Sequence, residues 1–133
     1  DGGPWRRLCA LPAFWVGLMY DQTALDAAWD LCKHWTAEQR DALRIAASVD
    51  GLQAKVDGID MYALAREVVA LSEAGLKARA MPGAGGLVPD ETHFLNALKE
   101  TLETGETPAD ELLRKYHGEW GGDLKRIYAE YSY

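Results

Sequence analysis

The sequence predicts an all-α protein of about six short helices packed round a central apolar helix. Three observations lead to this prediction. Apolar residues recur at i, i+3, i+4 and i+7 in most segments, which is the spacing of one helical face. No segment alternates apolar and polar residues over a useful length, as a half-buried strand would. Asp, Thr, Gly and Pro stand where helices are expected to begin or end.

The central helix is expected near the beginning of the chain, within a dense apolar run from Leu8 to Tyr20. A helix over about Leu11–Tyr20 is apolar nearly all round, which is typical of a helix buried in a core. Pro12 fits its first turn, where the missing N–H costs little. The run is too short to span a bilayer, which takes about 20 apolar residues. The other helices are expected to cover it.

Two amphipathic helices are expected next. Thr23 is a candidate cap for the first, and Thr36 with Gln39 forms a capping box that opens the second. Their predicted buried faces are Leu25, Ala28, Trp29 and Cys32 in the first helix, and Ala42, Ile45, Ala46 and Val49 in the second. The sequence therefore predicts that Trp29 is buried against the helix Leu11–Tyr20.

The second half of the chain predicts four more helices. The turn dipeptides Asp50–Gly51 and Asp57–Gly58 bracket a linking segment. Asp60 is expected to cap the longest helix, about Met61–Ala80, in which Gly75 costs about 1 kcal/mol relative to Ala. The Gly- and Pro-rich segment Met81–Pro89 is expected to be a surface loop. Three shorter helices are expected after it. Gly105 ends the first, Thr107–Pro108 begins the second and Gly118 ends it. The third has an apolar inner face formed by Leu124, Ile127, Tyr128 and Tyr131.

Composition limits the classes of function. A length of 133 residues suits one domain over residues 1–133, and a composition that is 48% hydrophobic and 26% charged is neither disordered nor membrane-like. A net charge of −7 argues against nucleic acid as a partner. The two cysteines, Cys9 and Cys32, suggest neither a metal pair nor a disulfide scaffold, so the cytoplasm is expected. No spacing of His or acidic residues predicts a metal site or a catalytic triad.

The beginning of the chain carries the strongest candidate for binding. In Gly2-Gly3-Pro4-Trp5-Arg6-Arg7, a flexible loop stands beside two fixed positive charges and an aromatic ring. Arginine binds phosphate and carboxylate through its planar fork. Arg6 and Arg7, with Trp5 beside them, are therefore candidates for binding an anionic ligand. Salt bridges from these arginines to acidic helix faces are the alternative.

The same residues carry a resemblance. The stretch DGGPWRRLCALPAFWVGLMYD resembles a characteristic stretch of glutamate–cysteine ligases of the plant and alphaproteobacterial type. Further segments follow in the order of that family: WTAEQRDALR (35–44), LAREVVALSEAGLKAR (64–79), DETHFLNAL (90–98), TPADELLRKYHGEWGG (107–122) and YAEYSY (128–133). The resemblance covers essentially the whole chain. The sequence departs from the family in DLKR (123–126) and in the loop at 81–88.

The resemblance implies a function for a larger polypeptide. The family makes γ-glutamylcysteine from L-glutamate, L-cysteine and ATP with Mg²⁺, through a γ-glutamyl phosphate, as the first step of glutathione biosynthesis. Residues 1–133 then form the C-terminal helical part of an α+β, glutamine-synthetase-like enzyme. The groups that hold Mg²⁺ and ATP are expected mainly on an antiparallel sheet in the remainder of that polypeptide.

For the chain itself, the resemblance implies no catalytic residue, no metal ligand and no activity in isolation. Arg6, Arg7 and Trp5 are the candidates for contact with anionic groups of ATP or substrate. The protein is expected in the cytoplasm, or in the plastid if it comes from a plant. The alternative is a stand-alone helical module, derived from the same scaffold, that binds or regulates a partner.

Overall fold

A computed structural model of the chain describes residues 5–80 and 91–131. The elements run in the order α1 (Trp5–Met19), α2 (Gln22–Cys32), α3 (Ala37–Asp50), η1 (Gly51–Gln53), β1 (Lys55–Val56), β2 (Ile59–Asp60), α4 (Met61–Arg79), η2 (Glu91–Leu95), α5 (Asn96–Thr104), α6 (Pro108–His117) and α7 (Lys125–Tyr131). The predicted all-α class is confirmed, since the described strands form only a two-residue ladder. The expected loops at 1–4 and 81–89 lie outside the described residues.

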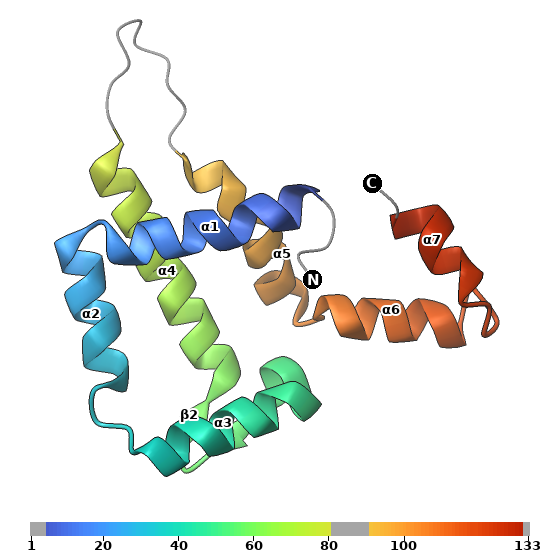
Figure 1. The fold of residues 1–133 in the computed structure, drawn as a ribbon, viewed down its shortest axis with the longest axis horizontal. Helices are drawn as coiled ribbons and strands as arrows, with labels where there is room; N and C mark the ends of the chain where they lie inside the picture. Colours follow the sequence, from blue (N-terminus) through green and yellow to red (C-terminus); the bar gives the residue numbers. More distant parts are fainter. Residues whose placement is uncertain (1–4, 81–90, 132–133) are drawn as a thin grey trace, which may run out of the picture.

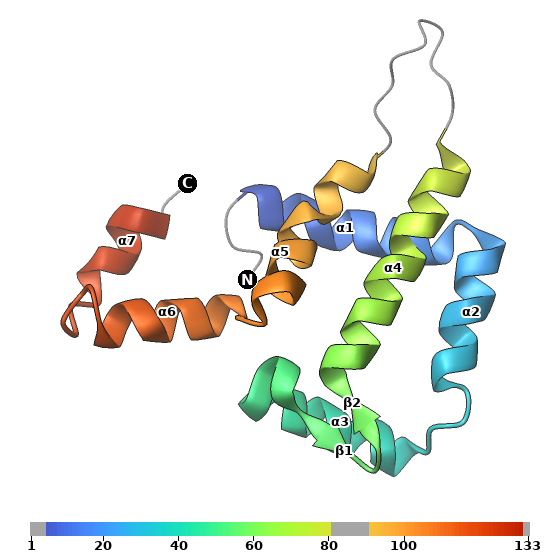
Figure 2. The ribbon, with the colours of Figure 1, turned by 180° about the vertical axis from the view of Figure 1, so that it is seen from behind.

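The helices are arranged around the crossing of α1 and α4. Figures 1 and 2 show α1 lying across α4 and α5, with α2 and α3 continuing round one side and α6 and α7 extending to the other. The core lies where α1, α4 and η2 meet, at Ala13, Leu76 and Leu95. Phe14, Val16 and Leu98 pack against these three residues. The predicted packing of helices around an apolar helix is therefore confirmed, but the predicted burial of that helix on all sides is wrong, since Leu11, Trp15 and Met19 are each more than half exposed.

Small residues allow α1 and α4 to approach closely. A Cβ atom at Gly75 would overlap the carbonyl oxygen of Gly17, and a Cβ at Gly17 would overlap the carbonyl oxygen of Ser72. The Ser72 side chain is fully buried, and its hydroxyl donates a hydrogen bond to the carbonyl of Phe14 at 2.9 Å. Gly75 lowers the helix propensity of α4, but it stands where the backbone of α1 passes.

The first helix begins earlier than predicted. Helix α1 starts at Trp5, so Pro12 lies inside it and not in its first turn, and Arg6 and Arg7 belong to the helix and not to a glycine-rich loop. A proline inside a helix removes one backbone hydrogen bond and costs about 3 kcal/mol. Pro12 is exposed, so the lost bond falls where water reaches the backbone, while Ala10 and Ala13 are buried on the opposite side.

The buried faces of α2 and α3 are each displaced by about one residue from the prediction. Trp29 was predicted to be buried but is 62% exposed, and Ile45 and Val49 are exposed too. Helix α2 instead turns Ala24, Ala27, Ala28 and Leu31 inward, again at i, i+3, i+4 and i+7. The predicted face with Trp29 and the observed face with Ala24 both satisfy the helical spacing. The alanine face prevails because small side chains let α2 pack close to the glycine crossing, where Ala24 is a near neighbour of Gly75.

Most helix boundaries follow from the capping residues. Asp60 caps α4 by accepting a bond from the N–H of Ala63, and Thr36 forms the predicted capping box with Gln39. Thr107 forms a second box, with Asp110, and Gly105 ends α5 at φ +68°. The predicted cap of α2 is wrong by two residues, because the Asp21 carboxylate accepts from the N–H of Ala24 at 2.8 Å. An ionised carboxylate is a better acceptor than the Thr23 hydroxyl at a helix N-terminus.

Candidate functional site

The predicted anion-binding residues lie in the first turn of α1, where the backbone of Trp5, Arg6 and Arg7 is helical. Only the side chain of Arg7 is among those described. It is 23% exposed, and its Nη2 donates to the Oε2 of Glu111 on α6 at 3.0 Å. The salt bridge that the sequence left open as an alternative is therefore present at Arg7. Binding of an external anion by this turn stays a prediction.

Glu111 is the centre of a cluster that joins α1 to α6 and α7. Besides Arg7, it accepts a hydrogen bond from the hydroxyl of Tyr131 at 2.6 Å, and the ammonium of Lys115 lies 3.7 Å away. The Tyr131 bond, followed by Arg7 and Lys115, lowers the pKa of Glu111 and outweighs the opposing effect of burial. Glu111 is therefore ionised at neutral pH, and its charge holds the Arg7 fork in place.

A second carboxylate completes this cluster. Glu130 accepts a bond from the indole N–H of Trp120 at 2.7 Å and one from Lys115 at 3.2 Å. Lys115 also lies 5.0 Å from the ring centre of Tyr131, and the Tyr131 hydroxyl and Glu130 raise its pKa. Trp120 is only 5% exposed. These contacts anchor α7 on α6, so the cluster fixes the first turn of α1 relative to both helices.

The sequence indicated single members of this cluster but not the cluster. In the sequence, Glu111 belongs to an acidic run that is typical of a solvated helix face, and Tyr131 and Trp120 have the character of packing residues. The i, i+4 spacing of Glu111 and Lys115 on α6 is a signal of adjacent opposite charges. Nothing in the local sequence shows that Arg7, more than a hundred residues earlier, completes the pair.

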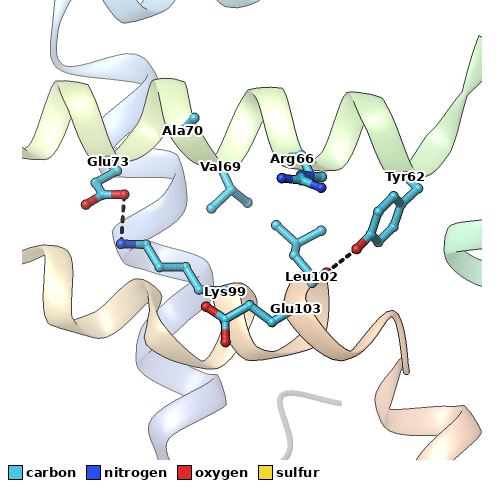
Figure 3. Close-up of a pocket in the computed structure, with 8 residues that line it drawn as sticks. All are labelled: Tyr62, Arg66, Val69, Ala70, Glu73, Lys99, Leu102 and Glu103. Carbon is cyan, nitrogen blue, oxygen red and sulfur yellow. Dashed lines mark hydrogen bonds and ion pairs between the residues drawn. The ribbon is translucent and has the colours of Figure 1, made fainter.

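A pocket of about 290 Å³ lies between α4 and α5 (Figure 3). It is lined by Tyr62, Arg66, Val69, Ala70, Glu73, Lys99, Leu102 and Glu103. The hydroxyl of Tyr62 donates to the carbonyl of Leu102 and closes one end. At the other end Glu73 accepts bonds from Lys99 and from Lys77, each at 2.7 Å. The bonds from Tyr62 and Lys99 join α4 to α5 at the two ends of the pocket, so the pocket is part of the packing between the two helices.

The charges of this pocket are largely matched. The bond from Lys77, and then that from Lys99, lowers the pKa of Glu73, so this carboxyl group is ionised at neutral pH. The guanidinium of Arg66 lies 5.9 Å from the ring centre of Tyr62. The pocket contains no poised acid, base or nucleophile of the kind that catalysis needs, within the part of the chain that the structure describes. Its geometry assigns no reaction.

Histidine, cysteine and acidic side chains are spread over the described residues 5–80 and 91–131. Within these ranges, no three His, Cys, Asp or Glu side chains come together as metal ligands do. Cys9 and Cys32 are both free thiols and partly buried. Within the same ranges, no helix has the length and apolar character needed to cross a bilayer.

Comparisons with known proteins agree with the resemblance. The family model for glutamate-cysteine ligase family 2 (GCS2) matches residues 1–130. The chain is 46% identical over 134 residues to the chloroplastic glutamate–cysteine ligase of Solanum lycopersicum, with all of the chain and 24% of that protein covered. It is 46% identical to the chloroplastic enzyme of Arabidopsis thaliana, also over 24% of its length. It is 39% identical to chloroplastic ligase A of Oryza sativa subsp. indica, over 25% of its length.

The matches also give the share of each relative that the chain spans. The chain aligns over its full length, yet it spans about a quarter of the relatives that it matches. The helices and the capping residues described above therefore correspond to one region of those longer proteins. The chain belongs to glutamate-cysteine ligase family 2.

Proposed function

We propose that this chain is the helical region of a glutamate–cysteine ligase. The complete polypeptide would form γ-glutamylcysteine from L-glutamate, L-cysteine and ATP, with Mg²⁺, through a γ-glutamyl phosphate. The observation that carries the proposal is an identity of 46% that extends over the whole chain to a named ligase. Because the chain covers 24% of that relative, the remainder of the polypeptide is its first partner.

The described helices give this function a scaffold and, within residues 5–80 and 91–131, no metal site. Magnesium would supply charge stabilisation at the transferring phosphoryl group. The described carboxylates do not fit such a site: Glu73 is held by two lysines, and Glu111 by Arg7 and Tyr131. We therefore assign the metal, and the oxygen ligands that it prefers, to the remainder of the polypeptide. The chain supplies the helices against which that part is built.

We further propose that the first turn of α1 faces the anionic groups of ATP or substrate. Arg6, Arg7 and Trp5 are the residues concerned. A lysine keeps the charge but loses the planar fork, so Arg6→Lys and Arg7→Lys should raise KM or lower kcat about ten- to a hundred-fold in the complete enzyme. An arginine that only supports the fold shows the opposite pattern, a lower melting temperature with normal kinetics. Arg7→Lys is decided by its kinetics, because the pairing of Arg7 with Glu111 predicts some loss of stability in either case.

The names of the relatives support a proposal about the compartment of the complete protein. The tomato, Arabidopsis and rice ligases are all described as chloroplastic. We propose a plastid location for the complete protein, in place of the cytoplasm that the cysteines suggested. A fluorescent fusion of the full-length protein that stays outside plastids would contradict this.

The function is tested in a chimera. The segment of the tomato ligase that matches this chain is replaced by residues 1–133, and ATP-dependent formation of γ-glutamylcysteine is measured with both substrates and Mg²⁺. We expect turnover within about tenfold of the tomato enzyme, since close packing tolerates related sequences at small cost. A chimera that folds but forms no γ-glutamylcysteine contradicts the proposed function.

A further inference from the structure

One face of α1 is apolar and exposed. Leu8 is 36% exposed, Leu11 56%, Trp15 52% and Met19 57%. Their spacing of three, four and four residues places them in one line along the helix. We call these four residues the α1 stripe. The other side of the helix is buried at Ala10, Ala13 and Gly17.

The α1 stripe does not have the composition of a surface that faces water. A surface helix normally turns charged and polar side chains to solvent, whereas no charged residue occurs between Leu8 and Met19. Contiguous exposed apolar patches mark interaction surfaces, and tryptophan is enriched among the residues that dominate them. The composition of the stripe is therefore typical of a surface that is buried against another surface.

The described part of the chain leaves the stripe uncovered. Figures 1 and 2 show α1 in an outer layer, with α4 and α5 together on one side of it and no described helix over the other. Those helices take up the buried side, through the Gly17–Gly75 crossing and the Ser72–Phe14 hydrogen bond. Another surface is needed to remove the stripe from water.

We propose that the α1 stripe is the surface on which the remainder of the ligase polypeptide packs. This inference rests on the proposed function, because it takes its partner from the three-quarters of the relatives' length that the chain does not span. The apolar composition of the stripe also fits this partner, because a permanent contact within one polypeptide is apolar like a core, whereas transient contacts are more polar. The partner surface should accordingly be apolar and lack unpaired charge.

The test compares the same substitutions in two settings. Leu11→Lys and Trp15→Glu are made in the 133-residue chain and in the chimera with the tomato ligase. In the chain alone both positions are solvated, so the melting temperature should change by no more than about 2 °C. In the chimera the new charge would be buried, so the melting temperature should fall by roughly 5 °C or more.

Leu113→Lys is the matched control, because Leu113 on α6 is exposed to the same 56% as Leu11 but has no apolar stripe around it. It should be neutral in both settings. The inference is overturned if Leu11→Lys and Trp15→Glu leave the melting temperature of the chimera unchanged. It is also overturned if they lower the melting temperature equally in both settings, because the stripe would then be part of the chain's own core. Size-exclusion chromatography supplies a further contradicting outcome. If the substitutions only dissociate a dimer, a second copy covers the stripe.

The failure of this inference is distinct from that of the proposed function. A folded but inactive unsubstituted chimera contradicts the function, while the melting temperatures still report on the stripe. An active chimera that tolerates Leu11→Lys and Trp15→Glu contradicts the stripe alone.

Discussion

Replacing Gly75 by alanine tests the helix crossing at the centre of the fold. In an ordinary helix this change is stabilising by about 1 kcal/mol, because alanine has the higher helix propensity. At Gly75 the added methyl group would overlap the carbonyl oxygen of Gly17 on α1. The overlap is with backbone, so no side-chain rotation relieves it and the two helices have to separate.

The magnitude follows from these opposing effects. Overpacking a close contact costs about 1–3 kcal/mol, and a backbone contact belongs at the upper end. Subtracting about 1 kcal/mol of propensity leaves a net loss of about 2 kcal/mol. For a chain of this size that corresponds to a melting temperature about 8 °C lower.

The assay is thermal unfolding followed by circular dichroism at 222 nm, and the control is Ala70→Gly. Ala70 is exposed on the same helix, so this control measures propensity alone and should cost about 1 kcal/mol. Adding a methyl group at position 75 and removing one at position 70 should then both destabilise. A melting temperature of Gly75→Ala equal to or above that of the unsubstituted chain would refute the reasoning about the crossing.

Three further results are expected from the same measurements. Ser72→Ala should lose about 1 kcal/mol, because it removes the buried hydrogen bond to the Phe14 carbonyl; an unchanged denaturant midpoint would show that this bond contributes nothing. Trp29→Ala should cost well under 1 kcal/mol, since the side chain is 62% exposed, and a loss of about 3–5 kcal/mol would restore the burial that the sequence predicted. Glu111→Gln should cost about 1 kcal/mol at pH 7. Because folding lowers the pKa of Glu111, the carboxylate's contribution is present above its ordinary pKa and is lost as the pH falls through the lowered one. The difference in stability between the two proteins should therefore shrink as the pH falls below the ordinary carboxyl range of about 4, and a difference that does not shrink in acid would assign the effect to packing.

The helix boundaries could be predicted from the sequence because they depend on local chemistry. A capping box needs only Thr36 and Gln39, three residues apart, and a left-handed C-cap needs only Gly105. The hairpin of β1 and β2 was not predicted, although Asp57–Gly58 is a typical two-residue turn, because each strand has only two residues and no alternation to read.

The buried faces could not be chosen from spacing alone. In α2, a face with Trp29 and a face with Ala24 fit the helical period equally well, and hydrophobicity favours the tryptophan. The decision depends on the close crossing at Gly75, which is a tertiary feature. Spacing also does not show which large apolar residues stay exposed, as Trp15 does.

For the candidate sites, too, the sequence indicated single residues but not the partners that distant parts of the chain supply. The sequence indicated Arg7 as a residue with an anionic partner, because the planar guanidinium binds carboxylates and phosphates in a bidentate fashion. It did not indicate Glu111 as that partner, since the two residues are 104 positions apart. The α4–α5 pocket was missed for a similar reason: Glu73 and Lys99 are on different helices, and each alone is an ordinary surface charge.

The central claim is that this chain supplies the scaffold of a ligase and that the chemistry belongs to the complete polypeptide. The most direct measurement is the formation of γ-glutamylcysteine by the purified 133-residue chain, with ATP, Mg²⁺, L-glutamate and L-cysteine. The account predicts a rate equal to that of a control without protein, under conditions in which the chimera turns over. Turnover by the chain alone, well above that control, would contradict it.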